Sequence, residues 1–448
     1  MVRKVVVVGL DSAPPRLLYD ELLGELEVLG ELVGGGRRYT LVSTHPPITI
    51  PAWASMVTGK TPGELGLYGF RHRRPGDVGE SYIVSSKMLK APAVWDVVGK
   101  KGLRSVVVGV PPSYPPKPVR GVMITDFVTP GPEKPYTWPP ALKREVERLV
   151  GAYVFDVVYR SEDKDRIIKE LWNMTRQHFR VLRYLASSFK WDFMMFVEIG
   201  VDRVHHAFWK YYDPQHPRHA AGSKYADVIH AYYSLLDSEL RELLRLIPKD
   251  AIVVVASDHG AKAMKGAFAI NQWLEEQGYL KLRRKPEKPC TELTPDIIDW
   301  EGTVAWGWGG YYARIFINLK GREPYGAVEP REYEAVIEEL RRDLLQVRGP
   351  RGEAWSTKVY TPRELYPEVR GDAPDLLVYL DNLNWRAAGT LGWESPYLEE
   401  NDRGPDDAVH DWYGVFAVYD PEGTLGTGDA GTVRAEEVAG LLLRLMGS

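Results

Sequence analysis

An acidic residue and a histidine follow directly on an apolar run near the middle of this 448-residue chain. Residues 253–256 are three valines and an alanine, which is typical of a buried strand in a parallel sheet, and Asp258 and His259 come next. Ligands gather beyond the carboxyl ends of such strands, and carboxylate oxygen and imidazole nitrogen both bind zinc. Asp258 and His259 are therefore candidate metal ligands. In the alternative, Asp258 caps a helix and His259 is bonded to the backbone.

Two more apolar runs end in a carboxylate. Residues 4–9 lead to Asp11, and residues 193–198 are followed by Asp202, with His206 four positions later. On a helical turn this spacing places Asp202 and His206 on the same face, where both could bind one metal ion.

A threonine with prolines on both sides is the candidate nucleophile. Thr49 lies at or just before the start of a predicted helix at 52–58, where backbone N–H groups favour an anion. The structural alternative is a helix-capping threonine. His410, which precedes a strand expected at 415–419, is the remaining candidate ligand.

These side chains together could carry out phosphoryl transfer. They are Asp11, Thr49, Asp202, His206, Asp258, His259 and His410. The set is large enough for two tetrahedral metal sites that leave positions for substrate oxygens or water. Two divalent ions about 4 Å apart can clamp the attacking and leaving oxygens of an in-line displacement at phosphorus. Metal coordination would also make the threonine hydroxyl an alkoxide and a competent nucleophile.

The elements that would hold these groups alternate between strand and helix. This alternation indicates an α/β fold with a doubly wound, mostly parallel central sheet and helices on both faces. Expected strands are 4–9, 39–43, 105–110, 119–125, 193–198, 251–256, 312–319, 358–360, 375–380 and 415–419, and expected helices are 14–33, 52–58, 95–101, several within 139–190, 223–246, 271–277, 332–345 and 435–446. Residues 283–310 and 382–409 read as irregular. We expect one domain over residues 1–448.

Composition limits the possible functions. Basic and acidic residues nearly balance, 57 Lys and Arg against 61 Asp and Glu, so the chain lacks the basic signature of a nucleic-acid binder. Its one cysteine, Cys290, excludes an intrachain disulfide and a thiolate metal cluster. No run approaches the ~20 apolar residues of a membrane helix, and residues 1–9 lack a signal-peptide pattern, so we expect a cytoplasmic protein without a membrane partner.

The order and context of these residues resemble the alkaline phosphatase superfamily, and within it the type I phosphodiesterase/nucleotide pyrophosphatase family. The resemblance covers most of the chain and rests on Gly9-Leu10-Asp11, Thr49-Ile50-Pro51-Ala52-Trp53 with Thr58-Gly59-Lys60-Thr61-Pro62-Gly63, Asp202-Arg203-Val204-His205-His206, Ser257-Asp258-His259-Gly260, and His410 before Gly414. It implies that one metal ion is held by Asp11, Thr49, Asp258 and His259, and a second by Asp202, His206 and His410. Thr49 would become a transient phosphothreonine, which water activated at the Asp202 site would hydrolyse. His205 is expected to pack rather than to bind metal. The resemblance also implies that residues 262–405, between His259 and His410, form an inserted cap that shapes substrate access.

The implied cofactors are two divalent metal ions, for which Zn²⁺ fits the ligands best and Mn²⁺ or Mg²⁺ is an alternative. The implied substrate is a small phosphate ester, and a nucleotide is one candidate. Nucleotide pyrophosphatases of the family commonly have a His-Gly pair and then an Asn after the nucleophile helix, where this chain has Leu65 and Phe70. This departure weakens a nucleotide-specific interpretation and leaves Arg71 or His72 as candidate phosphate contacts.

Hydrolysis of phosphodiester or pyrophosphate bonds is the favoured function. A phosphomonoesterase or phosphomutase on the same scaffold is the first alternative, because the fold does not determine the substrate. A sulfatase is disfavoured, since the superfamily's sulfatases need a Cys or Ser in a Cys/Ser-x-Pro-x-Arg context, where this chain has Thr49 and Trp53. A non-catalytic binding protein is the alternative from another class, and the complete ligand set argues against it.

Overall fold

A large central sheet organises the chain in the computed structural model, which describes residues 3–74 and 81–447. Its nine strands lie in the order β20-β2-β19-β9-β1-β8-β5-β6-β7. All of them run in one direction except β19 and β7, which are antiparallel to their neighbours. In that order they span Gly428–Arg434, Arg37–Val42, Tyr413–Tyr419, Ile252–Ala256, Val5–Leu10, Phe193–Glu198, Ser105–Val108, Gly121–Ile124 and Thr137–Trp138.

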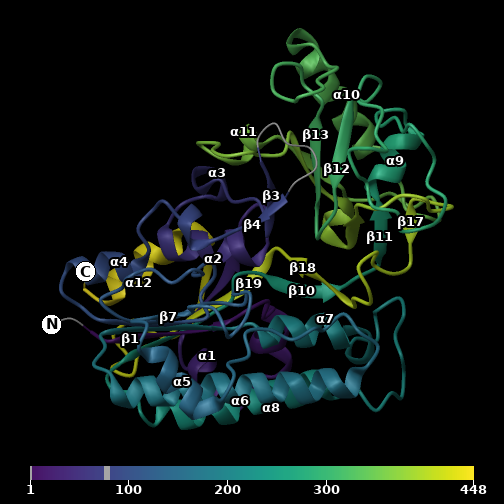
Figure 1. Cartoon of the computed structure of the whole chain (residues 1–448). Coiled ribbons are helices and arrows are strands. Elements are labelled where there is room, and N and C mark those ends of the chain that lie inside the picture. Colours follow the sequence, from purple (N-terminus) through teal and green to yellow (C-terminus); the bar gives the residue numbers. More distant parts are fainter. Residues whose placement is uncertain (1–2, 75–80, 448) are drawn as a thin grey trace.

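Both faces of this sheet are covered by helices (Figure 1). Side chains alternate along β1, so that Val6 and Val8 belong to one apolar cluster and Val5 and Val7 to another. The first cluster includes buried residues of α1 (Glu27–Gly34), α5 (Leu142–Val150), α6 (Lys164–Ser188), α7 (Gly200–Tyr212) and α8 (Val228–Leu244), and the second those of α2 (Thr49–Thr58), α4 (Val94–Lys100) and α12 (Val438–Leu445). The predicted doubly wound, mostly parallel sheet is confirmed.

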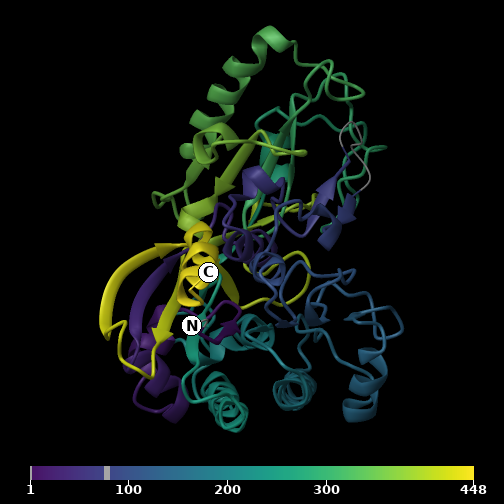
Figure 2. The same ribbon diagram turned by 90° about the vertical axis from the view of Figure 1, so that its left-hand side faces the viewer.

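Residues between β9 and β19 form a second lobe beside the sheet (Figures 1 and 2). Its four-stranded antiparallel sheet has the order β12-β13-β15-β14, spanning Ala305–Trp308, Ala313–Ile317, Leu376–Tyr379 and Lys358–Tyr360. A three-stranded sheet, β16-β11-β17, spans Trp385–Ala388, Gly266–Ala269 and Tyr397–Leu398, and the helices are α9 (Ile270–Glu276), α10 (Tyr333–Leu345) and α11 (Pro362–Leu365). Trp300, Trp306 and Trp385 are buried in the apolar cluster of this lobe. This lobe contains the proposed cap, residues 262–405, and is called the cap.

The chain enters and leaves the cap through paired strands. β10 (Gly260–Ala263) and β18 (Ala408–Asp411) are antiparallel, and Ala261 lies opposite His410 in their register. This pairing brings His410 beside the end of β9, although 151 positions separate His259 from His410 in the sequence.

Several elements differ from the sequence prediction. The helix expected at 14–33 is broken into a π-helical turn, Arg16–Glu21, and α1, because Gly24 and the turn around it interrupt the pattern. β20 was not predicted, since this edge strand is glycine-rich and mostly exposed. The prediction that residues 283–310 are irregular is wrong for β12, where Gly307 and two tryptophans obscure the alternating pattern. The prediction that residues 382–409 are irregular is wrong for β16 and β17, which are too short to give a recognisable pattern.

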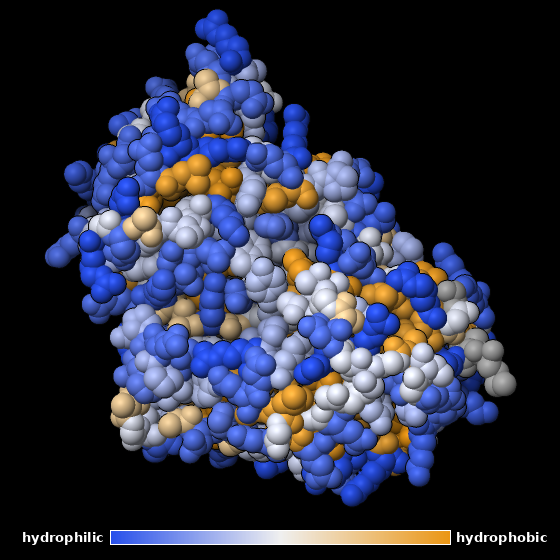
Figure 3. All heavy atoms as spheres, turned by 180° about the vertical axis from the view of Figure 1, so that it is seen from behind, coloured by the Kyte–Doolittle hydropathy of each residue, from blue (hydrophilic) through white to orange (hydrophobic). Residues whose placement is uncertain are grey.

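The face of the molecule seen from behind in Figure 3 is mainly hydrophilic. On the face opposite that of Figure 1, hydrophilic residues cover most of both lobes and apolar atoms form separate patches (Figure 3). Among the described residues, no helix has the length and apolar character that crossing a bilayer requires.

A buried ion pair links the sheet domain to the cap. Arg73 in β3 (Arg71–Arg73), which pairs with β4 (Ser81–Ile83), is 2 % exposed. Its guanidinium donates to both Glu323 carboxylate oxygens at 2.7 and 2.8 Å and to Asp372 Oδ1 at 2.9 Å. It also lies 4.5 Å from the centroid of the Phe316 ring.

Replacing Arg73 by alanine is expected to destabilise the protein by ~3–5 kcal/mol, because Glu323 and Asp372 lose their buried counter-charge. Thermal or urea unfolding measures this loss. Arg341→Ala is the matched control, since its pair with Glu364 at 2.7 Å is partly exposed and worth less than ~1 kcal/mol. Equal losses in the two variants would show that Arg73 does not hold the lobes together.

Candidate active site

Three neighbouring strands deliver carboxylates to one edge of the central sheet. Asp11 follows β1, Asp258 follows β9, and Asp202 lies in the first turn of α7, directly after β8. Since β9, β1 and β8 are adjacent and parallel, their carboxyl ends meet. The three side chains are buried and converge.

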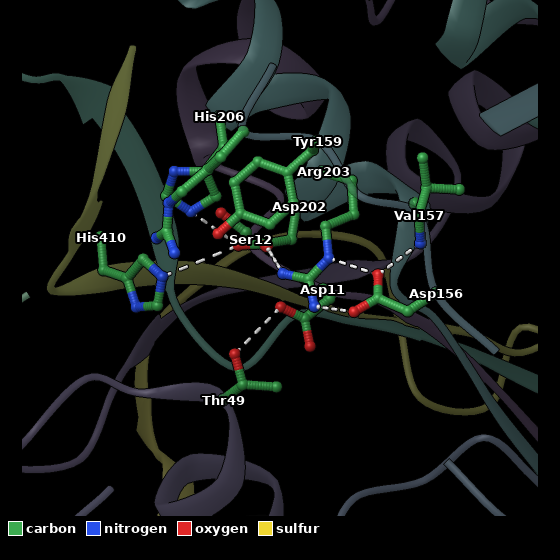
Figure 4. A network of polar contacts seen from close by, with 12 residues as sticks. Asp11, Ser12, Thr49, Asp156, Val157, Tyr159, Asp202, Arg203, His206 and His410 are labelled. Atoms are coloured by element: carbon green, nitrogen blue, oxygen red, sulfur yellow. Dashed lines mark hydrogen bonds and ion pairs between the residues drawn. The ribbon is translucent and has the colours of Figure 1, made fainter. Parts of the chain in front are cut away.

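Asp11, Asp258 and His259 form one group, whose ligand atoms lie within 4.8 Å of one another. His259 Nε2 is 3.2 Å from Asp258 Oδ2 and 3.8 Å from Asp11 Oδ1. The Thr49 hydroxyl is 3.5 Å from Asp11 Oδ1 (Figure 4). It is also 3.4 Å from His259 Nε2. The structure therefore brings together the four residues predicted to hold the first metal ion.

The residues predicted to hold the second ion also meet. His206 Nε2 lies 3.2 Å, and His410 Nε2 3.7 Å, from Asp202 Oδ1 (Figure 4). Asp202 and His206 share one face of α7, as their spacing predicts. Asp202 and His410 also form a group with His259 in which the ligand atoms lie within 4.8 Å of one another, and the rings of His259 and His410 stack at 3.8 Å. The two predicted ligand sets are thus direct neighbours.

The side chains of His206, His259 and His410 are oriented alike relative to the carboxylates. In each, Nδ1 contacts an oxygen: Asp406 Oδ1 at 2.7 Å from His206, the Gly260 carbonyl at 3.0 Å from His259, and the Pro47 carbonyl at 2.8 Å from His410. Donation from Nδ1 leaves the Nε2 lone pair directed at the carboxylates. An oxygen that fixes the tautomer in this way is the usual outer partner of a metal-binding histidine.

The buried carboxylates of this centre create negative charge that a bound cation would compensate. Burial and the neighbouring carboxylate charges raise the pKa of Asp11 and of Asp258 well above the usual range. Burial also opposes the charge on Asp202, but His206, Arg203 and His410 outweigh it and lower its pKa. Burial lowers the pKa of His259 to about 4, so its imidazole is neutral at pH 7.

Two buried carboxylate oxygens in the centre, Asp202 Oδ1 and Asp258 Oδ2, have no hydrogen-bond donor. Unpaired buried carboxylate oxygens are costly unless a cation or donor compensates them. Burial opposes protonation of His206, but the charges of Asp406 and Asp202 outweigh it and raise its pKa well above the usual range. With imidazole nitrogens facing the carboxylates, the donor set fits divalent metal ions such as zinc.

The candidate nucleophile stands at the start of α2. Thr49 is the first residue of this helix, which begins three positions earlier than predicted, so its hydroxyl lies where backbone N–H groups are free. One turn later, Trp53 Nε1 donates to Asp11 Oδ2 at 2.8 Å. Trp53 therefore orients Asp11 relative to Thr49, a role that its sequence position did not reveal.

Other residues of the centre were also missed. Arg203 donates from Nη1 to Asp202 Oδ2 at 2.6 Å and from Nε to Asp156 Oδ1 at 2.7 Å (Figure 4). The Tyr311 hydroxyl is 3.1 Å from His206 Nε2, and its ring stacks on His410 at 3.8 Å. Arg203 and Trp53 belong to motifs that carry the family resemblance, whereas Tyr311 does not. His205 packs as expected, with Nε2 3.3 Å from the Tyr233 hydroxyl.

A cavity of about 430 Å³ opens beside this centre. Thr49, Asp202 and His410 form part of its wall, and cap residues such as Tyr311 form another part. Arg71 also lines it. His72 lies outside the lining, where its Nε2 accepts a hydrogen bond from the Tyr68 N–H at 3.2 Å and burial lowers its pKa to about 3. Of the two predicted substrate contacts, Arg71 therefore lies at the cavity and His72 does not.

Solved structures with the same fold include enzymes that act on phosphorus compounds. Human ectonucleotide pyrophosphatase/phosphodiesterase 5 aligns with a TM-score of 0.57 at 13% identity, covering 99% of this chain and 95% of that chain. An inactive form of the murine enzyme in complex with AMP gives a TM-score of 0.56 at 13% identity with the same coverage. Phosphonoacetate hydrolase from Sinorhizobium meliloti 1021, in complex with phosphonoformate, gives 0.57 at 16% identity and covers 99% and 96%.

A search of curated proteins found no significant match. A sequence profile of the type I phosphodiesterase/nucleotide pyrophosphatase family, however, matches residues 5–406. The matched segment includes every predicted ligand except His410, and it spans most of the chain. The chain belongs to the type I phosphodiesterase/nucleotide pyrophosphatase family.

Proposed function

We propose that this protein is a two-metal phosphoesterase that hydrolyses phosphodiester or pyrophosphate bonds through a phosphothreonine intermediate. The observation that carries this proposal is the position of the Thr49 hydroxyl. It lies within 3.5 Å of Asp11 and His259, at a helix N-terminus, and on the wall of a cavity that can hold a substrate. Family membership supports the same class of reaction.

Two sets of side chains would hold the metal ions. Asp11, Thr49, Asp258 and His259 would bind one ion, and Asp202, His206 and His410 the other. Bound divalent ions would supply Lewis-acid charge that lowers the pKa of the threonine hydroxyl and neutralises the phosphoryl oxygens. Zinc fits this donor set best, and manganese or magnesium remains the alternative.

The chain's own groups position the two displacements. Thr49 loses its hydroxyl proton to solvent, its Oγ1 forms a bond to phosphorus, and the bond to the leaving oxygen breaks. The free N–H groups at the start of α2 are placed to bind phosphoryl oxygen. Water then forms a bond to phosphorus while the bond to Thr49 Oγ1 breaks, and Thr49 regains a proton. The products are the leaving alcohol or phosphate and a phosphate monoester.

The substrate within this class is a further part of the proposal. A nucleotide is one candidate, because a structural neighbour binds AMP. A phosphomonoesterase or phosphomutase would use the same centre, and a non-catalytic binding protein would not need the Thr49 geometry. A rate panel of diesters, dinucleotides and monoesters separates these functions.

The decisive test is hydrolysis of bis-4-nitrophenyl phosphate by the purified protein with added Zn²⁺, Mn²⁺ or Mg²⁺, together with metal analysis. We expect release of 4-nitrophenol and about two tightly bound ions per chain. Less than one ion per chain, with no hydrolysis under any of the three metals, would overturn the enzyme proposal.

Removing the metal ions with a chelator is expected to abolish hydrolysis and to lower the unfolding temperature. The buried carboxylates Asp11, Asp202 and Asp258 then repel one another without compensation. Returning metal at 100 times its Kd should restore about 2.7 kcal/mol of stability for each site. Differential scanning calorimetry with and without metal measures this, and an unchanged unfolding temperature would contradict metal binding at the centre.

A further inference from the structure

Five arginines line the cavity beside Thr49, which is unusual in a chain with a net charge of -4. They are Arg71, Arg160, Arg203, Arg314 and Arg386. Among the residues that the structure describes, only two carboxylates, Asp156 and Asp202, share the lining with them. The wall of the cavity therefore carries a local excess of positive charge, and the partners of each arginine decide how much is available to a ligand.

Two of the five are neutralised by carboxylates. Arg203 donates to Asp156 and Asp202, as described above. Arg160 donates to Asp406 Oδ2 from Nε at 3.1 Å and from Nη2 at 2.9 Å. These arginines orient the metal centre and contribute little net charge to the cavity.

Arg71 and Arg314 have no ion-pair partner in the part of the chain that the structure describes. Arg314, which is half-buried, donates from Nη1 to the Arg71 carbonyl at 2.7 Å and lies 4.9 Å from the centroid of the Trp308 ring. Burial lowers the pKa of Arg314, but a guanidinium stays charged at neutral pH. Both charges are thus left for a ligand.

Arg386 is only partly compensated. It is 7 % exposed, its Nε and Nη1 have no hydrogen-bond partner, and Nη1 is 3.5 Å from Asp406 Oδ2. That carboxylate already accepts from Arg160 and contacts His206. Arg386 lines the cavity, and a guanidinium that shares an already paired carboxylate leaves positive charge there for an anion.

The fold holds the first two arginines in place. Arg71 lies in β3, which Arg73 anchors to Glu323 and Asp372 of the cap, and Arg314 lies in β13 of the cap. Gly69 lies beside Arg314, where a Cβ would stand 3.6 Å from Nη1. The missing side chain leaves space next to the guanidinium. Because the Arg314 guanidinium is held by the Arg71 carbonyl and the Trp308 ring, a ligand that binds it would lose little affinity to ordering of this side chain.

We infer that this cavity binds a substrate with a second anionic group, a carboxylate or a phosphate, on the ester group that stays attached to phosphorus when the leaving group departs. The retained group is assigned to the cavity because it stays on the phosphorus that is bonded to Thr49 between the two displacements, and Thr49 itself lines the cavity. Guanidinium groups bind carboxylate and phosphate in the same bidentate geometry. This inference rests on the proposed hydrolysis at Thr49.

Three matched diesters test it, all with 4-nitrophenolate as the leaving group. They are 4-nitrophenyl butyl phosphate, 4-nitrophenyl 3-carboxypropyl phosphate and 4-nitrophenyl 3-phosphonooxypropyl phosphate. In each, Thr49 Oγ1 displaces 4-nitrophenolate and the alkyl ester stays on phosphorus. We expect kcat/KM for at least one anionic ester to exceed that for the butyl ester by roughly 10- to 100-fold, the range for charge-assisted hydrogen bonds. The larger ratio identifies carboxylate or phosphate as the preferred anion.

Arginine variants test whether the preference for anionic esters arises in the cavity. Arg314→Gln and Arg386→Gln should each lower that ratio about tenfold while keeping the unfolding temperature and metal content. Arg363→Gln, an exposed arginine in α11 outside the cavity lining, removes the same charge and should keep the ratio.

Three outcomes would overturn the inference. Equal kcat/KM for the three esters in the unaltered protein means that no second anion is recognised. An equal loss on all three esters in the Arg314→Gln variant means that this arginine binds the reacting phosphate. No hydrolysis of any ester with zinc, manganese or magnesium means that the proposed function itself fails, and the inference with it.

Discussion

Replacement of Thr49 by alanine is expected to lower kcat for bis-4-nitrophenyl phosphate by roughly 10³-fold or more. The variant loses the hydroxyl that lies between Asp11 and His259 and with it the covalent step. The six other predicted ligands remain, so both metal ions should still bind. Turnover measured beside metal content separates loss of the nucleophile from loss of the metal centre.

The covalent intermediate offers a direct readout. Rapid acid quench followed by intact-mass analysis should show a phosphoryl adduct at Thr49 in the unaltered protein and none in Thr49→Ala. Thr49→Ser keeps a hydroxyl and should retain part of the activity. Thr58→Ala removes a hydroxyl at the other end of α2, where it donates to the Ala54 carbonyl, and should leave the rate near normal. A near-normal rate in Thr49→Ala would contradict the covalent mechanism.

The part of the centre that lies at strand ends could be predicted from the sequence. Asp11 and Asp258 follow continuous apolar runs, and parallel strands place such residues at a common edge. The pair Asp202 and His206 was found from helical spacing alone. In these cases a local sequence pattern determines where the side chain lies, so its position can be predicted without knowledge of the tertiary structure.

The parts that depend on packing between distant segments could not be predicted. Asp406 reaches His206, and Arg386 reaches the cavity, only because the cap folds back on the sheet domain. Both lie in the stretch 382–409, which has no periodic pattern over most of its length. Tyr311, which contacts His206 and His410, follows two glycines in a turn before β13. The charge excess of the cavity depends on which ion pairs each arginine forms in the folded chain, and these pairs join distant segments.

The second prediction with a large expected effect concerns His410, because this residue contacts members of both predicted ligand sets. Its Nε2 is 3.7 Å from Asp202 Oδ1, its ring stacks on His259, and its Nδ1 contacts the Pro47 carbonyl just before Thr49. His410→Ala is expected to lose metal mainly from the Asp202 site, so that metal content falls from about two ions to about one per chain. Activity should fall by roughly 10²-fold or more, since a metal ion contributes several kcal/mol to transition-state stabilisation.

A matched variant separates metal binding from packing. His205 is as buried as His410 but contacts Tyr233 instead of the carboxylates, so His205→Ala removes a side chain of the same size without removing a predicted ligand. We expect both variants to lower the unfolding temperature, and only His410→Ala to lower metal content in dialysed protein. If His410→Ala kept two ions at the original affinity, the second ligand set would be wrong. If His205→Ala lost an ion to the same extent, metal loss would reflect disturbed packing around α7 rather than a missing ligand.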